Sequence, residues 1–246
     1  MTRIKIDLAP EREPVYTSAL DRLGITTVTN ADHDALITGD PTRATASDKP
    51  CLLDQPGCPP APSHTHIMPA HPWRFLPETT AVHQSLTSGQ LGQPGLLRIH
   101  HWLTSDTPIA TATVPQIDLA HWLFASPPAS VHTLARPGYL QLHLGFAGSG
   151  MALIDIATAR PGDADYYSLH LIGSEGAAYA DDHRNTHLLF DTGNPTALVH
   201  HQNFTLATTN MLAAFVAAVE NNHPWPVTTA ATTGALETLQ QATGRA

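Results

Sequence analysis

The first third of the chain alternates short apolar strands with a helical stretch. Residues 3–8 (RIKIDL) alternate apolar and polar side chains, as a half-buried strand does. Residues 13–23 repeat apolar side chains at helical spacing until Gly24 ends the helix. Further short strands are expected at residues 25–29, 35–38, within 49–56, and at 64–68. Strands that alternate with helical segments predict a small parallel α/β layer.

The rest of the chain predicts strands joined by short turns, with helices at both ends. Helices are expected at 77–88, at 118–124 with Asp118 as its N-cap, around Met211–Val219, and at 231–242. Strands are expected at 96–103, 130–135, 139–146, 151–158, 166–172, 187–190 and 197–201. This order predicts an α+β domain with a large, mainly antiparallel sheet and flanking helices. The boundary near residues 75–77 gives domains 1–76 and 77–246.

Composition narrows the possible functions. The 246 residues carry a formal net charge of −9, and Lys5 and Lys49 are the only lysines. So acidic a chain repels phosphate backbones and anionic lipid, which argues against nucleic-acid and membrane partners. No apolar run approaches the roughly 20 residues of a spanning helix, and the N-terminus turns acidic before a signal-peptide core, so we expect a cytoplasmic protein. Cys51 and Cys58 have the spacing of neither a redox pair nor a zinc site.

Five short segments occur in an order that is typical of one enzyme family. Trp73–Pro77 and Ser88–Pro94 match an "RF-x-P … G-x-LG-x-P" passage, and Ile117–Val131 matches a segment that contains "D-x-x-x-WL". Leu171–Gly176 contains a "GS-x-G" turn, and Asn210–Val227 matches a C-terminal helix pair. No single segment is specific, but together they resemble the Gfo/Idh/MocA family of glucose–fructose oxidoreductases and inositol dehydrogenases.

The resemblance implies a Rossmann-like N-terminal domain that binds NAD(P), and a C-terminal domain whose open sheet supports oligomerisation. Family members oxidise or reduce sugars and related polyols. Their chemistry uses a lysine from a Glu-Lys-Pro turn, and an aspartate and a histidine from a D-x-x-x-H segment before the Trp-Leu helix. Because only 76 residues precede the boundary, the Rossmann-like domain is expected to be shortened.

The cofactor fingerprint is absent from its expected place. A G-x-G-x-x-G turn after the first strand lets the backbone approach a pyrophosphate at a helix N-terminus. Here residues 8–14 (LAPEREP) follow the strand, and the first glycine of the chain is Gly24. Glu11 and Glu13 would satisfy the positive end of the helix and oppose a diphosphate. We therefore expect no cofactor, and NAD(P) only if it binds by another route.

The three catalytic positions of the family hold none of its acid–base residues. Asp54-Gln55-Pro56 occupies the place of the Glu-Lys-Pro turn, with a neutral amide where the lysine stands. Counting back from Asp118, Pro115 falls at the histidine and Thr111 at the aspartate. Because the three roles are coupled in one proton-transfer site, their joint absence predicts that the family's chemistry is lost.

Residues near these positions remain candidates for binding a sugar-like ligand: Asp54, Gln55, Arg74, Asp118 and His121. Arg74, at the domain junction, could bind an anionic group or form a salt bridge. Asp118 is more simply a helix N-cap, and Asp54 more simply the holder of a turn.

Three histidines form a possible metal-binding group. His64 and His66 lie two residues apart on an expected strand, with both rings on one face, and His71 follows nearby. Zinc or a similar ion accepts such ligands. Since no cysteine or carboxylate is close, partly exposed polar histidines are the simpler interpretation.

Other histidines alternate with leucines along the expected strands of the second domain. His143 is out of phase with its neighbouring leucines, His170 is in phase with Tyr166, and His100 is in phase with Trp102. One face of the sheet therefore carries leucine, and the other carries His, Tyr and Gln. If the second face packs against a partner subunit, the interface is mixed and not purely apolar.

Three interpretations follow. The preferred one is a non-catalytic scaffold, ligand sensor or partner subunit, either a homo-oligomer through the C-terminal sheet or a hetero-oligomer with an active relative. The second is an active NAD(P)-dependent sugar or polyol oxidoreductase. The third is a metal-dependent enzyme that uses His64, His66 and His71. Titration with dinucleotides separates the first two, and elemental analysis tests the third.

Overall fold

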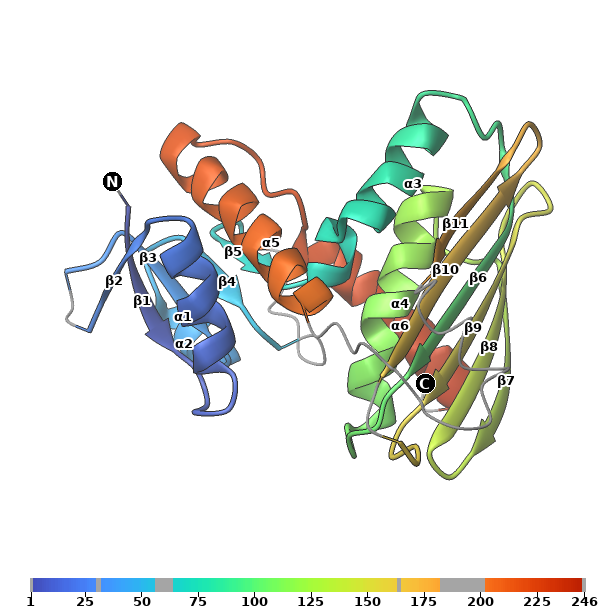
Figure 1. Cartoon of the computed structure of the whole chain (residues 1–246), viewed down its shortest axis with the longest axis horizontal. Helices are drawn as coiled ribbons and strands as arrows, with labels where there is room; N and C mark the ends of the chain where they lie inside the picture. Colours follow the sequence, from blue (N-terminus) through green and yellow to red (C-terminus); the bar gives the residue numbers. More distant parts are fainter. Residues whose placement is uncertain (1, 30–31, 56–63, 163–164, 182–201, 245–246) are drawn as a thin grey trace, which may run out of the picture. The chain divides into compact units, whose positions relative to one another are not determined.

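The helices and strands form two units (Figure 1). The first comprises Met1–Leu76 with His201–Gly234, and the second comprises Pro77–His200 with Ala235–Ala246. The computed structural model describes residues 2–29, 32–55, 64–162, 165–181 and 202–244. The predicted boundary at residues 75–77 assigns residues 201–234 to the second domain, whereas in the structure they group with the first unit.

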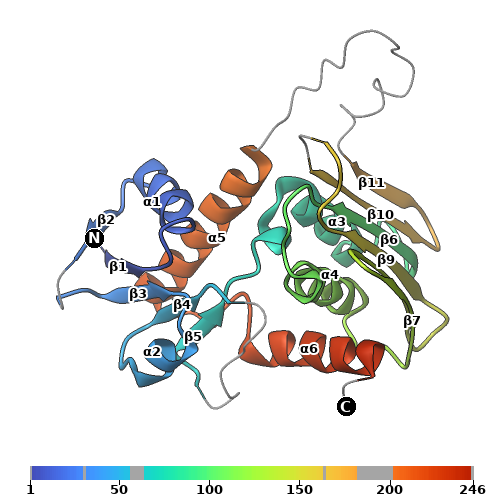
Figure 2. The same cartoon turned by 90° about the horizontal axis from the view of Figure 1, so that it is seen from below.

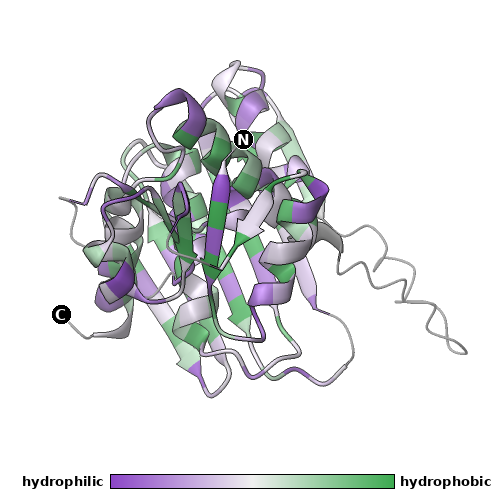
Figure 3. Cartoon of the chain, turned by 90° about the vertical axis from the view of Figure 1, so that its left-hand side faces the viewer, coloured by the Kyte–Doolittle hydropathy of each residue, from purple (hydrophilic) through white to green (hydrophobic). Residues whose placement is uncertain are grey.

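A five-stranded sheet of order β2-β1-β3-β4-β5 forms the first unit. Its strands are β1 (Arg3–Asp7), β2 (Thr26–Val28), β3 (Ala35–Thr38), β4 (Cys51–Leu53) and β5 (Ile67–Pro69). Every pairing is parallel, as the alternation of strands and helices predicts. Figure 3 shows hydrophobic and hydrophilic residues alternating along strands. The Rossmann-like parallel layer is therefore confirmed.

Helices cover the two faces of this sheet unequally. Its helices are α1 (Glu13–Arg22), α2 (Pro41–Ala46), the 3₁₀ helix η1 (Pro72–Phe75), α5 (Gln202–Asn221) and the start of α6 (Thr229–Thr243). Under α1 and α5 lies the larger core, which contains Ile4, Tyr16 and Phe215 (Figure 2). A smaller cluster that includes Leu36 and Ala44 lies under α2. The short α2 was not predicted, and Asp40 caps it by accepting from the Thr42 amide.

The second unit contains a six-stranded sheet of order β11-β10-β6-β9-β8-β7. Its strands are β6 (Pro94–Trp102), β7 (Ser130–Arg136), β8 (Tyr139–Gly145), β9 (Met151–Ala157), β10 (Tyr166–Gly173) and β11 (Ala177–Asp181). Only β6 and β9 pair in parallel, so the predicted, mainly antiparallel sheet is confirmed. Helices α3 (Pro77–Thr87) and α4 (Ile109–Phe124) lie on one face of it (Figure 1).

The two faces of the second sheet differ as the alternation predicts. On β8, Leu140, Leu142 and Leu144 are buried, while His143 is exposed. The leucines face α3 and α4, because buried residues of β6 and β9 share that side. We call this the inner face, and we call the opposite side, which carries His100 and His143, the outer face.

Several predicted elements need correction. The expected strand at 64–68 begins only at Ile67, so His64 and His66 precede it. The expected short helix at 118–124 is the second half of α4, which starts at Ile109. Strand β11 was not predicted, and the strands expected at 187–190 and 197–201 fall outside the described residues. In the part of the chain that the structure describes, no helix has the length and apolar character needed to cross a membrane.

Candidate functional site

The carboxyl ends of the strands of the first unit are where a doubly wound sheet binds its ligands. The loop 8–14 leaves β1 there and leads directly into α1, and Asp54 follows β4 at the same edge of the sheet. In the dinucleotide fold this place holds the glycine-rich turn. Here two proline residues, Pro10 and Pro14, and the exposed Glu11 and Glu13 take its place.

The N-terminus of α1 has its backbone donors occupied. The amides of Arg12 and Glu13 donate to the carbonyl of Ala9, at 2.9 and 3.1 Å, and the Val15 amide donates to the Arg12 carbonyl at 3.2 Å. Pro14 lies between them and has no N–H. The Glu13 carboxylate in the first turn complements the helix dipole. These residues do not form the cradle of free N–H groups that a diphosphate needs.

Arg12 and Asp54 form an ion pair across this edge of the sheet. The Arg12 Nε and Nη2 atoms donate to the two carboxylate oxygens of Asp54, both at 2.9 Å. The Asp54 side chain is only 6% exposed, whereas that of Arg12 is 39% exposed. From the sequence, Asp54 was predicted to hold a turn. Instead its carboxylate binds a guanidinium brought from the start of α1.

A buried tyrosine completes this group. The Arg12 guanidinium lies over the Tyr16 ring, 5.9 Å from its centroid. Burial and the neighbouring Asp54 carboxylate raise the pKa of Tyr16 well above its usual value, although Arg12 opposes the change. Burial would lower the pKa of Arg12, but Asp54 and Tyr16 raise it overall. Tyr16 therefore stays neutral and Arg12 stays charged near pH 7, so Arg12 remains a cation beside the Asp54 carboxylate.

Arg12 and Tyr16 were not among the residues proposed from the sequence. One signal could have found Arg12: the carboxyl ends of parallel strands meet at one edge, so a loop after β1 approaches a residue after β4. Arg12 is the one cation in the loop, and Asp54 is the one acid directly after β4. The sequence could therefore have predicted that Arg12 and Asp54 pair, but it could not have predicted the distance between them.

None of the positions that the resemblance assigns to the family's catalytic residues carries an acid or a base. Gln55 is exposed after β4 in the first unit. In the second unit, Thr111 is exposed in the first turn of α4, and Pro115 is buried in the interior of that helix. Neither an amide nor a proline exchanges a proton near pH 7.

Asp118 is not the helix N-cap expected from the sequence. Helix α4 begins at Ile109, so Asp118 lies in its second half and is fully buried. A proline in a helix interior removes a backbone hydrogen bond, so the sequence gives little local sign that a helix runs through Pro115. In the structure the helix continues through Pro115.

Two further ligand candidates, Arg74 and His121, lie in different units of the chain. Arg74 lies in η1 and is 9% exposed. His121, in the last turn of α4, has its Nε2 atom 3.1 Å from the Thr238 hydroxyl. Their binding of a sugar-like ligand stays a prediction.

The three histidines of the possible metal group are not brought together. His64 and His66 lie in the turn before β5, and their rings meet edge to face, with centroids 5.8 Å apart. The His66 Nε2 atom is 3.1 Å from the carbonyl of Ala44. His71 is fully buried, with Nε2 at 2.8 Å from the Thr232 hydroxyl. Among the described residues no three His, Cys, Asp or Glu side chains form a group that could hold a metal ion.

Comparison with known proteins identifies solved structures of the same fold. No protein-family model and no curated protein matches the sequence. A candidate myo-inositol dehydrogenase from Sinorhizobium meliloti 1021 has a TM-score of 0.79 at 17% identity, over 100% of this chain and 97% of that one. A myo-inositol dehydrogenase from Corynebacterium glutamicum has a TM-score of 0.76 at 14% identity, over 100% and 96%.

A third structure, a scyllo-inositol dehydrogenase from Lactobacillus casei, contains bound NAD(H) and scyllo-inositol. It has a TM-score of 0.77 at 12% identity and covers 100% of this chain and 96% of its own. Such low identities establish architecture and not activity. The resemblance found in the sequence motifs is thus confirmed at the level of the fold. The chain has the fold of the inositol dehydrogenases and other Gfo/Idh/MocA-type oxidoreductases.

Proposed function

We propose that this protein is a non-catalytic, oligomeric relative of the inositol dehydrogenases that does not bind a dinucleotide. The observation that carries the proposal is the first turn of α1. The amides of Arg12, Glu13 and Val15 are bonded within the chain, and Pro14 has no amide hydrogen. A pyrophosphate at this place would have to displace these bonds and meet the carboxylate of Glu13.

The catalytic positions support the same proposal. Gln55, Thr111 and Pro115 supply no group that takes up or releases a proton near pH 7. Hydride transfer between a dinucleotide and a sugar alcohol requires a base for the hydroxyl proton. A protein that lacks both the cofactor cradle and the base is suited to a role as scaffold, ligand sensor or partner subunit.

The outer face of the second sheet supports self-association. Four of the five large exposed hydrophobic side chains of the described residues lie on it: Leu134, Met151, Ile172 and Tyr179. Beside them, the Asp155 carboxylate accepts from the Tyr139 hydroxyl at 2.9 Å and from the Gln141 amide at 2.7 Å. Apolar side chains around a satisfied polar centre are typical of a protein interface. A second copy of the chain is our proposed occupant, and an active relative is the alternative.

Calorimetric titration with NAD(H) and NADP(H) tests the loss of cofactor binding. We expect no heat of binding at millimolar dinucleotide. Micromolar binding would contradict the proposal. In that case Arg12→Gln and Arg22→Gln form a matched pair, because both residues lie at ends of the same helix and only Arg12 borders the dinucleotide position. A change of affinity confined to Arg12→Gln would place the cofactor at the carboxyl ends of the strands.

An active NAD(P)-dependent oxidoreductase is the second candidate. It is favoured by the likeness over the whole chain to a structure solved with NAD(H) and scyllo-inositol. It predicts dinucleotide binding together with turnover of a sugar or polyol. The same titration therefore separates the two candidates, and the absorbance of the reduced nicotinamide reports the turnover.

A further inference from the structure

A short crossover leaves part of one face of the first sheet without a helix. Strands β2 and β3 lie on opposite sides of β1, and only residues 29–34 connect them. Such a connection between parallel strands usually needs about a dozen residues and contains a helix. On the same side of the sheet, α2 packs on β3 and β4. Next to it, over β1, the structure has an open pocket of about 460 Å³.

Both lysines of the chain line this pocket. Lys5 comes from the middle of β1, and Lys49 comes from the segment before β4. Lys5 pairs in register with Leu36, whose side chain belongs to the cluster under α2, so both side chains point to that side of the sheet. Arg43 adds a third permanent cation to the lining. The lining therefore contains three of the twelve Lys and Arg residues of the chain, together with Asp7 and Asp48.

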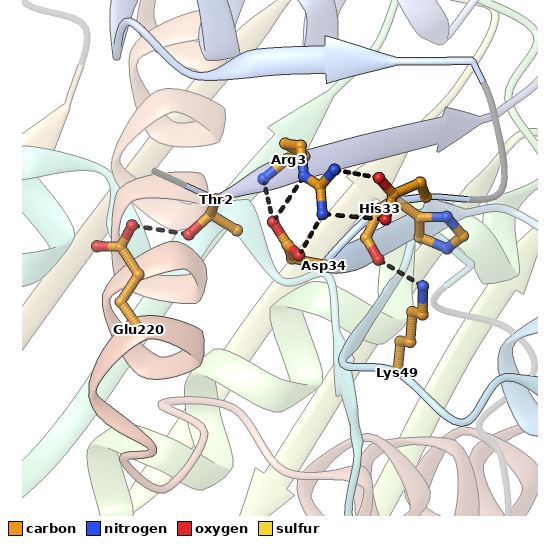
Figure 4. Close-up of polar contacts among 7 residues, drawn as sticks. Thr2, Arg3, His33, Asp34, Lys49 and Glu220 are labelled. Carbon is orange, nitrogen blue, oxygen red and sulfur yellow. Dashed lines mark hydrogen bonds and ion pairs between the residues drawn. The ribbon is translucent and has the colours of Figure 1, made fainter.

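The neighbouring charges hold the wall of the pocket in place. The Lys49 ammonium donates to the carbonyl of His33 at 2.5 Å (Figure 4). Arg3 binds the carboxylates on either side of this histidine, with Nη2 at 3.1 Å from Asp32 and at 3.2 Å from Asp34. Arg3 carries one positive charge against these two carboxylates, and the Lys49 ammonium also lowers the pKa of both. Asp32 and Asp34 are therefore partly balanced by Lys49, whereas Lys5 is not drawn into this group.

Within the lining itself, the cations outnumber the carboxylates. Arg43 forms an ion pair with Asp7 and lies 3.7 Å from Asp40, which leaves the exposed Asp48 as the other acid of the lining. Lys5 has no hydrogen-bond or ion-pair partner among the residues that the structure describes. A lysine in this position is available to an anion from solution.

His33 adds a further unused polar group. Its Nδ1 atom is buried and has no hydrogen-bond partner within the described part of the chain. A buried ring nitrogen without a partner costs free energy unless a water or a ligand satisfies it. His33 lines the pocket together with Lys5 and Lys49.

We propose that this pocket binds a small molecule that carries a phosphate group, through Lys5, Lys49 and His33. The volume lies within the range of small-ligand sites, and ammonium groups are common phosphate ligands. A phosphate group accepts hydrogen bonds on several oxygens, which suits donors that come from three separate segments. The pocket lies on the face of the sheet and not at the carboxyl ends of its strands. The proposal is therefore independent of the loss of dinucleotide binding.

The two lysines allow a direct test. Protein labelled with ¹³C at lysine Cε gives two signals, which Lys5→Gln and Lys49→Gln assign. Inorganic phosphate is then added at constant ionic strength. We expect both signals to shift along saturating curves with one common dissociation constant, and sodium chloride at equal ionic strength to leave them in place. Signals that do not move, or that move linearly without saturation, would overturn the proposal.

A matched pair of variants gives an independent readout. Lys5→Gln removes the unpaired ammonium and is expected to weaken phosphate binding about tenfold, as loss of a charged hydrogen bond does. Arg98→Gln removes an exposed cation of the second unit and should leave the affinity unchanged. Unchanged unfolding midpoints show that both variants fold. Equal affinity in Lys5→Gln and the wild type would exclude the pocket as the site.

The same variants keep this proposal distinct from the proposed loss of cofactor binding. If a dinucleotide binds through its phosphates in the pocket, Lys5→Gln weakens it and Arg12→Gln does not. If it binds at the carboxyl ends of the strands, the order is reversed. Phosphate binding without dinucleotide binding would support both proposals.

Discussion

Arg12 and Asp54 are joined by two parallel hydrogen bonds of 2.9 Å, which link the start of α1 to the end of β4. In a dinucleotide-binding sheet the same edge is kept open for a pyrophosphate. Here an internal cation and an internal anion meet there, above the buried Tyr16. In a cofactor-binding domain, the positive helix N-terminus faces the negative pyrophosphate at this edge. Here the positive Arg12 faces the negative Asp54 instead, and both charges belong to the protein.

Removal of Arg12 is expected to destabilise the first unit. Arg12→Leu leaves the Asp54 carboxylate, which is 6% exposed, without its guanidinium. Breaking a buried pair is costly, and since Arg12 is 39% exposed we expect a loss of about 2 kcal/mol in the free energy of unfolding. Urea unfolding followed by circular dichroism measures it.

The control for this substitution lies on the same helix. Arg22→Leu changes an exposed arginine in the last turn of α1 and should cost much less. The double variant Arg12→Leu/Asp54→Leu should recover part of the loss, because it leaves no buried charge unpaired. If Arg12→Leu costs no more than Arg22→Leu, the ion pair behaves as an ordinary surface pair.

A second prediction concerns Gly173, which packs directly on the backbone of another motif. A Cβ atom at this position would lie 1.9 Å from the carbonyl oxygen of Leu91. The segments are also joined by the Ser174 amide, which donates to the Gln93 carbonyl at 2.9 Å. Gly173→Ala must move main chain and is expected to cost about 3 kcal/mol of unfolding free energy.

Gly95→Ala is the matched control for Gly173→Ala. Gly95 has an ordinary φ angle, and its Cβ would lie 3.4 Å from the nearest atom, the carbonyl oxygen of Ile172. Thermal unfolding of the two variants should therefore differ by several degrees. Equal midpoints would mean that the turn at Gly173 shifts without cost.

Close packing at Gly173 also gives a physical reason for the glycines of two sequence motifs, because the two segments contact each other. The "G-x-LG-x-P" passage and the "GS-x-G" turn were recognised only as familiar patterns. In the structure a Cβ at Gly92 would meet Ser174, and one at Gly173 would meet Leu91. Such reciprocal contacts depend on a tertiary approach between segments far apart in sequence, which neither periodicity nor composition can report.

Local patterns predicted the fold well where burial alternates regularly. The leucines of β8 and the apolar repeat of α5 marked their buried sides correctly. The prediction failed at α4, because a proline inside a helix is locally unfavourable and tertiary packing overrides that preference. It also failed for His64 and His66, since the strand begins after them at Ile67. The sequence shows directly that the G-x-G-x-x-G pattern does not follow the first strand, but it does not show that Arg12 and Asp54 form an ion pair there.

The buried His101 predicts a loss of stability in mild acid. Burial lowers the pKa of His101 from 6.5 to about 4. The unfolded chain therefore binds a proton that the folded chain refuses between these values. The stabilisation is complete above about pH 6.5 and declines as the pH falls towards 4, by about 3 kcal/mol in total. Urea unfolding measured at several pH values tests this expectation.

Two variants isolate the contribution of His101. The Gln116 amide lies 3.2 Å from the Nδ1 atom of His101. Phenylalanine keeps an aromatic ring at this position but has no group that titrates, so it is the informative substitution. His101→Phe should be less stable at pH 7 but should lose less stability between pH 6.5 and pH 4 than the wild type. His143→Gln, which changes an exposed histidine, should retain the wild-type slope. A wild-type slope in His101→Phe would assign the acid sensitivity to other groups.

The last prediction concerns self-association through the outer face. Ile172 and Met151 align with Leu96 across β10, β6 and β9, so the three side chains form an apolar row. Asp at Ile172 or Met151 would place an unpaired charge in a desolvated interface, and we expect Met151→Asp/Ile172→Asp to weaken the dimer about a hundredfold. Leu206→Asp, at the one other large exposed hydrophobic residue of the described chain, should leave the molar mass unchanged. Light scattering after size-exclusion chromatography distinguishes these outcomes, and a wild-type protein that is monomeric at high concentration would contradict the prediction.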